Sequence, residues 1–252
     1  MDTVKLTPRL QCVADCIKEC RMLADIGTDH AYIPIYSVQT GIADSAIASD
    51  VVKGPLKIAT DNIKSHNLQD RIIPVLANGL ESAKNADVIV IAGMGGKLIC
   101  NILQDNMDIA KNADYLVIQP MTCSYELRKF LHENGFSITE ERLAREEDKI
   151  YNIIVVQKGN EKFEDDFYYH IGKKLFENND PLLLEHIKMR AEVIHKQIEG
   201  LKKASDSQLH LKAKKLENTL HRIIQEVDKN GKYMQFIERQ GSYGLDGHLF
   251  QM

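Results

Sequence analysis

The fold of this chain is decided by the stretch Leu23-Ala-Asp-Ile-Gly-Thr-Asp-His-Ala-Tyr32. Its apolar run ends in Asp25, a glycine turn follows at Gly27, and a helix is expected to begin a few residues later. In sheet-and-helix proteins, such a turn lies at the carboxyl end of the first strand, where a nucleotide-like ligand binds. We therefore predict an α/β fold whose ligand site begins at this turn.

A second carboxylate, Asp50, closes the next apolar run. Acids at two successive strand ends suit a ligand with ribose hydroxyls and a positive charge, and S-adenosylmethionine (SAM) carries both. A carboxylate can accept hydrogen bonds from both ribose hydroxyls, so Asp50 is the candidate ribose ligand and Asp25 the candidate partner of the methionine amino group. NAD and FAD fit poorly, because a dinucleotide turn needs glycines where this chain has Asp29 and Ala31.

Apolar runs without polar alternation recur along the first 160 residues, and they are typical of parallel strands covered on both faces. They fall at residues 22–26, 46–48, 72–76, 88–92 and 115–118. Helices are expected at residues 7–19, 32–39, 55–66, 96–108 and 125–134. Two last strands, at 136–145 and 151–157, are joined by so short a link that we expect an antiparallel pair. The pattern predicts a Rossmann-like sheet sandwich.

Composition indicates a protein of the reducing cytosol. The chain has 252 residues, 44% hydrophobic and 27% charged, as is ordinary for soluble proteins. Its apolar runs are far shorter than the ~20 residues that span a bilayer, and the N-terminus lacks a secretion signal. Five cysteines, an odd number, argue against a disulfide framework. We expect a cytoplasmic monomer that does not associate with membranes.

Beyond Gly159 the pattern changes to helical. Apolar residues step alternately by three and four along 184–201 and again along 209–227, as in helices that pack on each other. Ser205 and Gln208, between them, have capping-box spacing. We predict an antiparallel coiled-coil hairpin, joined to the sheet by a helix over 165–176. The expected domains are 1–160 (SAM binding), 161–232 (a helical coiled coil) and 233–252 (a tail).

The hairpin segment is basic. Residues 182–232 hold eleven Lys or Arg against seven Asp or Glu, a net of +4 in a chain whose total is −4. A basic appendage on an acidic body is relevant to RNA binding. Two solvated helix faces would give the same pattern, and charge alone does not separate these interpretations.

Further candidate site residues follow the other strands. Three glycines in four positions after the fourth run, at 93–96, let another group approach the backbone closely. Asn78-Gly79 could place an amide near the adenine ring, and Gln119-Pro120 could line the acceptor pocket. Each has a structural alternative: a tight helix–strand contact, a common turn or a strand end. For the first turn the alternative is a plain strand-to-helix turn with Asp29 as N-cap.

A metal site is not expected. Cys12, Cys16 and Cys20 repeat every four residues, but structural zinc needs four ligands and no histidine is near them in the sequence. These three cysteines are better interpreted as small buried hydrophobic residues. The chain also lacks a Gly-x-Ser-x-Gly elbow, a P-loop and a His-Glu-x-x-His motif.

Three motifs resemble the bacterial tRNA (adenine-22-N1)-methyltransferase family: Ala24-Asp-Ile-Gly-Thr-Asp-His-Ala-Tyr32, Val51-Val-Lys-Gly-Pro55 and Ile91-Ala-Gly-Met-Gly-Gly-Lys-Leu-Ile99. Arg9-Leu10, Gln119-Pro120 and Leu127-Arg128 fit it too. The resemblance implies a Class I Rossmann-like methyltransferase domain, SAM as donor, a C-terminal coiled-coil hairpin, and transfer to N1 of an adenine in the D-loop region of tRNA. Asn78 and Asp50 depart from the family, which usually has Asp and often Glu there.

We therefore expect three groups of site residues. Cofactor binding is assigned to Asp25, Gly27, Thr28, Asp50, Val51, Asn78, Gly79, Ala92, Gly93 and Met94. Catalysis is assigned to Asp29, His30 and Tyr32, and tRNA binding to Arg9, Gly95, Gln119, Pro120, Lys202 and Lys203. The alternatives are a SAM-dependent methyltransferase that acts on another RNA base or a small molecule, and a non-catalytic RNA-binding protein.

Overall fold

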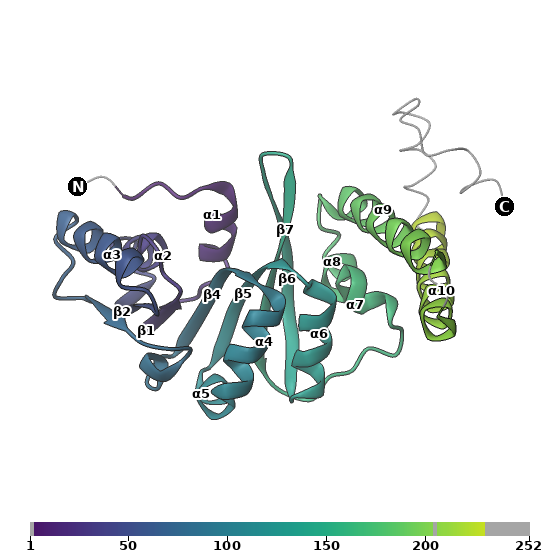
Figure 1. The fold of residues 1–252 in the computed structure, drawn as a ribbon. Helices are drawn as coiled ribbons and strands as arrows, with labels where there is room; N and C mark the ends of the chain where they lie inside the picture. The colour runs from purple at the N-terminus through teal and green to yellow at the C-terminus, as the bar shows by residue number, and fades with distance from the viewer. Residues whose placement is uncertain (1–2, 204–205, 230–252) are drawn as a thin grey trace. The chain divides into compact units, whose positions relative to one another are not determined.

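The computed structural model describes residues 3–203 and 206–229, and it divides into two compact units (Figure 1). The first, Met1–Leu183, holds the sheet, and the second, Leu184–Met252, holds two long helices. We call them the sheet unit and the hairpin unit. The predicted tail at 233–252 lies outside the described residues.

Strands and helices alternate in the sheet unit as the apolar runs predict. The strands are β1 (Cys20–Ile26), β2 (Ala43–Asp50), β3 (Ile72–Leu76), β4 (Val88–Gly95), β5 (Tyr115–Thr122), β6 (Phe136–Glu146) and β7 (Lys149–Lys158). The helices are α1 (Pro8–Ala14), α2 (Tyr32–Gln39), α3 (Lys53–Ser65), α4 (Gly96–Asp105), α5 (Met107–Asn112), α6 (Ser124–Glu133), α7 (Phe167–Ile171) and α8 (Lys173–Glu177), with a 3₁₀ turn, η1, at Glu81–Ala83.

All seven strands form one sheet in the order β3-β2-β1-β4-β5-β7-β6. Strands β1 to β5 pair in parallel, whereas β7 runs antiparallel to both β5 and β6, which confirms the predicted antiparallel pair. The strand order reverses between β1 and β4. In open α/β sheets, ligands bind at such a switch point, at the carboxyl ends of the strands.

Alternate residues of the central strands supply two separate cores, one on each face of the sheet. Val88 and Val90 of β4 pack with the buried residues of α1, α2 and α3. Ile89 and Ile91 pack with those of α4, α5 and α6 on the other face. Because both faces are covered, the strands are apolar throughout, and the predicted sheet sandwich is confirmed.

One predicted helix was too long, and two others are broken in the structure. The first begins as expected, with Thr7 as N-cap and Pro8 at its first position, but it ends at Ala14, and the chain then turns so that Cys16 and Ile17 are buried. The helix predicted over 96–108 is split at Asn106, whose φ of −133° is not helical. The helix predicted over 165–176 is broken into α7 and α8 at Gly172, which has a φ of +111°.

The residues around this break belong to the sheet unit because a buried ion pair holds them there. Arg128 on α6 donates to Glu141 on β6 at 2.6 Å, to Asn152 on β7 at 2.8 Å and to the backbone carbonyl of Tyr169 on α7 at 3.2 Å. A Cβ at Gly172 would lie within 3.0 Å of both Arg128 and Glu141. The sheet unit therefore extends past residue 160, while the predicted domain limits stay a prediction.

The hairpin unit consists of α9 (Leu183–Lys202) and α10 (Ser207–Lys229). Its predicted seam residues are buried or half-buried wherever side chains are described, with Ile194, Ile198 and Ile223 at 3% exposure or less. Lys202 of α9 forms an ion pair with Glu217 of α10 at 2.8 Å. The predicted helical hairpin is confirmed. Ser205 of the proposed capping box lies outside the described residues.

Candidate active site

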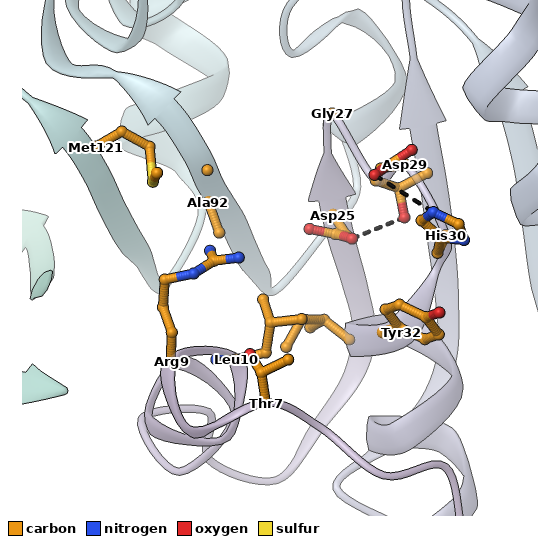
Figure 2. Close-up of a pocket in the computed structure, with 13 residues that line it drawn as sticks. Thr7, Arg9, Leu10, Asp25, Gly27, Asp29, His30, Tyr32, Ala92 and Met121 are labelled. Atoms are coloured by element: carbon orange, nitrogen blue, oxygen red, sulfur yellow. Dashed lines mark hydrogen bonds and ion pairs between the residues drawn. The ribbon is translucent and has the colours of Figure 1, made fainter. Parts of the chain in front are cut away.

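A cavity of about 360 Å³ opens at the carboxyl ends of β1 and β4, where the strand order reverses (Figure 2). In Figure 2, residues of α1 border one side, the turn after β1 another, and Met121 at the end of β5 a third. The lining residues are Thr7, Arg9, Leu10, Asp25, Gly27, Thr28, Asp29, His30, Tyr32, Ile33, Ala92, Gly93 and Met121. Its size is within the range of small-molecule sites.

Asp25 is the buried carboxylate of this cavity. The Thr28 hydroxyl donates to its Oδ2 at 2.7 Å, and the other carboxylate oxygen points into the open space (Figure 2). Burial raises the pKa of Asp25 to about 6, and the negative charge of Asp50 adds to the shift, while the Thr28 hydrogen bond opposes it. A buried carboxylate of this kind gains from a cationic ligand, since the ligand replaces the lost hydration.

The turn from β1 into α2 uses unusual backbone conformations. Gly27 has a φ of +74°, and both Asp29 and Ala31 are left-handed, with φ of +47° and +57°. Such conformations cost free energy in non-glycine residues and cluster at functional sites. The N-cap position of α2 is Ala31, and no side chain caps the helix. The interpretation of Asp29 as an N-cap is therefore wrong.

Asp29, His30 and Tyr32 form a small group on one side of the cavity (Figure 2). The Nε2 atom of His30 lies 3.6 Å from Oδ2 of Asp29, whose side chain is 66% exposed. The rings of His30 and Tyr32 are stacked, with centroids 5.1 Å apart and planes 4° from parallel. The group therefore presents a solvated carboxylate next to a flat ring pair.

The glycine run at the end of β4 and the start of α4 combines open backbone at one position with tight packing at another. Gly93 has a φ of +78°, and a Cβ there would find no atom nearer than Arg9, at 3.9 Å. At Gly96, by contrast, a Cβ would lie 2.6 Å from the carbonyl oxygens of both Thr122 and Cys123. Gly93 therefore leaves room at the cavity, whereas Gly96 is required where α4 packs against the chain that follows β5.

Arg9 of α1 is held at the cavity by several partners. Its Nη1 donates to Oε1 of Gln119 at 2.7 Å, its Nε lies 3.7 Å from Glu146, and its guanidinium lies 5.5 Å from the ring centre of Tyr151. The Gln119 oxygen also accepts from the Gly93 amide at 3.1 Å. Gln119 is fully buried, so it positions Arg9 and Gly93 without lining the cavity itself.

The structure brings nine of the predicted site residues to the cavity wall: Arg9, Asp25, Gly27, Thr28, Asp29, His30, Tyr32, Ala92 and Gly93. Six others of the sheet unit are not among the lining residues: Val51, Asn78, Gly79, Met94, Gly95 and Pro120. Asp50 is also outside the lining, and its Oδ1 accepts from the backbone amide of Val52 at 2.7 Å. Lys202 and Lys203 belong to the hairpin unit.

Sequence reasoning missed four lining residues: Thr7, Leu10, Ile33 and Met121. Thr7 and Leu10 come from the start of α1, where only Arg9 was assigned to the site, although Arg9-Leu10 fits the family motifs. Met121 directly follows Gln119-Pro120, and its sulfur lies 3.6 Å from the Gln119 amide nitrogen. Extending that predicted pair by one residue would have found it.

No cluster of three or more His, Cys, Asp or Glu that could hold a metal is found in residues 3–203 and 206–229. Burial raises the thiol pKa of Cys12 and Cys20 to about 11 and that of Cys16 to about 12, as in cysteines that serve as small hydrophobes. Within the same residues, no helix is long and apolar enough to cross a bilayer.

The sheet order and the acidic turn at the switch point define a Class I methyltransferase architecture. Residues 23–226 match the model of the tRNA (adenine(22)-N(1))-methyltransferase family. The tRNA (adenine(22)-N(1))-methyltransferase of Bacillus subtilis is 35% identical over 64% of this chain and 68% of its own length. The chain belongs to this family, as the sequence motifs predicted.

Solved structures agree with this assignment. The B. subtilis M1A22 tRNA methyltransferase TrmK matches with a TM-score of 0.79 at 29% identity, over 87% of this chain and 99% of its own. M. capricolum TrmK, solved in complex with the cofactor product S-adenosyl-homocysteine, matches with a TM-score of 0.74 at 29% identity, over 88% of this chain and 98% of its own.

Proposed function

We propose that this protein is an enzyme that transfers a methyl group from SAM to N1 of adenine 22 in tRNA. The observation that carries this proposal is the family match over residues 23–226, which includes the turn after β1 and Gly93 near the end of β4, both of which border the cavity. When bound, SAM supplies the methyl carbon that the in-plane lone pair of adenine N1 attacks.

The β1 side of the cavity fits SAM. The free oxygen of Asp25 accepts from the ammonium of its methionine part, and the open backbone at Gly93 allows close approach. Asp50 accepts from the ribose hydroxyls; it is close enough to raise the pKa of Asp25, although it does not line the cavity. Val51, Asn78 and Gly79 hold the adenine ring of SAM from the neighbouring strand ends, and Thr28, Ala92 and Met94 complete the set.

The acceptor side uses Asp29, His30 and Tyr32. Methylation makes the adenine ring cationic, so the solvated carboxylate of Asp29 stabilises the charge that develops and accepts from the exocyclic amine. The stacked rings of His30 and Tyr32 orient the base. Arg9, held in place by Gln119, lines the cavity on this side, and Gly95 and Pro120 support it from β4 and β5 without lining it. Alignment of the reactants supplies most of the acceleration, and no metal is required.

The helical segment 161–232 binds tRNA phosphates, with Lys202 and Lys203 among its contacts, while residues 1–160 bind SAM. N1 lies on the pairing edge of adenine, so the nucleotide must leave its stack, at a cost on the order of a few kcal/mol. Phosphate contacts by the basic hairpin offset this cost and make binding salt-sensitive. We assign the enzyme to the cytoplasm, where tRNA is modified, and expect it to act as a monomer.

The experiment that tests this function is mass-spectrometric mapping of methylated nucleosides in an unmodified tRNA transcript incubated with SAM, with and without the protein. We expect 1-methyladenosine at position 22 only when protein and SAM are both present. A transcript with guanosine at position 22 is the matched control and should stay unmodified. Methylation at another position, or none, would contradict the proposal.

A further inference from the structure

Large apolar side chains gather at one edge of the sheet unit. Eight are exposed among its described residues, and six of these lie at or just after the carboxyl ends of strands β1 to β5: Tyr32, Val51, Val52, Leu76, Leu98 and Met121. Single exposed apolar residues need no explanation, but a group at one edge marks an interaction site. Tyr32 and Met121 also line the cavity, so the group is continuous with the site described above.

Leu98 and Met121, two residues of this group, stand on a projection of the sheet formed by β4 and β5. The last residue of β4 that pairs with β1 is Ile91, and the last residue of β5 that pairs with β7 is Ile118. Beyond them β4 and β5 pair only with each other, through an irregular register, as far as Gly95 opposite Thr122. Bulges of this kind next to active sites redirect side chains.

The top of this projection carries Lys97, Leu98, Met121 and Thr122, which we call the β4–β5 ledge. The close approach of Gly96 to the Thr122 carbonyl places the first turn of α4 directly beside the end of β5. All four residues are exposed, Leu98 at 52% and Met121 at 42%. Lys97 forms no ion pair among the residues that the structure describes, so its charge is not neutralised there.

We propose that the β4–β5 ledge binds the unpaired nucleotides of tRNA that flank the target adenosine. This inference rests on the proposed function: when adenine 22 leaves its stack, the faces of neighbouring bases are uncovered. Leu98 and Met121 offer apolar surface to those faces, and Lys97 offers a cation to the adjoining phosphate. The sheet unit thus has an RNA contact of its own, beside the cavity and separate from the basic hairpin.

Two single substitutions separate the apolar from the ionic part of the ledge. Binding of an unmodified tRNA transcript to the full-length protein is measured at several salt concentrations. Leu98→Ser should weaken binding about fivefold with an unchanged slope of log Kd against log salt. Lys97→Gln should weaken it about threefold and reduce that slope by about one. Leu98→Phe should restore binding to at least the wild-type level.

Lys57-Ile58 on α3 supplies the control, because it is also a lysine followed by a branched aliphatic residue, both exposed on the same unit, with Lys57 paired to Asp61 at 3.5 Å. Lys57→Gln and Ile58→Ser should leave tRNA binding within twofold of wild type. SAM affinity, measured by titration calorimetry, should be unchanged in all variants.

Equal tRNA binding by the wild type and the Leu98→Ser and Lys97→Gln variants would overturn the inference, as would equal losses of tRNA affinity in the α3 controls. If the wild type fails to methylate adenine 22, the proposed function itself is wrong, which is a separate result.

Discussion

The two sides of the cavity differ in how firmly their residues are fixed. On the β1 side, Asp25 is buried, hydrogen-bonded to Thr28 and surrounded by left-handed backbone. On the β4–β5 side, Gly93 and Met121 are exposed, and Gly93 leaves space. A fixed carboxylate suits a small cationic ligand of constant shape, whereas the open side suits a large RNA whose target base also contacts Asp29 in the turn after β1. The following predictions test this division.

The largest effect is expected at Asp29. Asp29→Ala should lower the rate of N1 methylation at least 100-fold, because removing one electrostatic contact to a developing charge costs about 2.7–4 kcal/mol. Asp29→Asn keeps a hydrogen-bond acceptor, and asparagine tolerates the left-handed backbone. The methylation rate should therefore fall less in Asp29→Asn than in Asp29→Ala. The measurement is single-turnover methylation of a tRNA transcript. Asp61→Asn, which alters an exposed carboxylate on α3, is the control, and unchanged turnover in Asp29→Ala would remove Asp29 from the mechanism.

A somewhat smaller effect is expected at Asp25. Asp25→Asn should weaken SAM binding about 10- to 100-fold, because a hydrogen bond to a charged group contributes about 1.5–3 kcal/mol. The same variant should be more stable than the wild type without ligand at neutral pH, since it removes a buried charge. Calorimetric titration and urea denaturation measure the two effects. A variant that binds SAM normally would show that the ammonium is held elsewhere.

The pH dependence of SAM binding follows from the same carboxyl group. Its pKa is raised from 3.8 to about 6, and a cationic ligand requires the ionised form. The Kd for SAM should therefore rise about tenfold per pH unit below pH 6 and level off above pH 7. Without ligand, the raised pKa favours the folded state at low pH, so this contribution to stability is lost as pH rises from about 4 to 6. Asp25→Asn should show neither dependence.

The two glycines on the β4 side should respond differently to alanine. Gly96→Ala should reduce the free energy of unfolding by about 2–3 kcal/mol, because the new Cβ would meet two carbonyl oxygens. Gly93→Ala should cost only ~1–2 kcal/mol, for its left-handed backbone, but should impair SAM binding or methylation because it narrows the cavity. Urea denaturation measures the stability of each variant, and calorimetric titration measures its affinity for SAM. Equal stability of both variants would show that α4 can shift away from β5.

Much of the fold could be predicted because continuous apolar runs have few alternatives. Helix α2 and strand β3 have the bounds expected from sequence, and the short charged link correctly indicated an antiparallel pair. The end of β4 could not be predicted, because its glycines indicate a turn, whereas pairing with β5 continues to Gly95. The break at Gly172 depends on the space needed by Arg128 and Glu141, which come from distant parts of the chain.

For the site, the sequence indicated those residues whose chemistry and position coincide. Asp25, Gly27 and Asp29 stand out because carboxylates and glycine after an apolar run are informative in themselves. Leu10 and Met121 reach the same cavity but look like ordinary apolar residues, and only the packing of α1 and β5 places them there. The burial of Gln119 is likewise a tertiary property: its amide is useful because Arg9, far away in sequence, donates to it.

The smallest effect is expected in the hairpin unit, where neighbouring lysines differ in their partners. Lys202 is bonded to Glu217 at 2.8 Å, whereas for Lys203 no ion pair is found within the described part of the chain. Lys203→Gln should therefore weaken tRNA binding two- to threefold and reduce the salt slope by about one, because it removes a whole phosphate contact.

Lys202→Gln should have less effect, since an RNA contact there must first displace Glu217. Glu217→Gln should strengthen tRNA binding slightly by releasing Lys202. Titrations of the three variants with tRNA at several salt concentrations measure the order of their affinities. A larger loss of tRNA affinity in Lys202→Gln than in Lys203→Gln would show that the ion pair opens when tRNA binds.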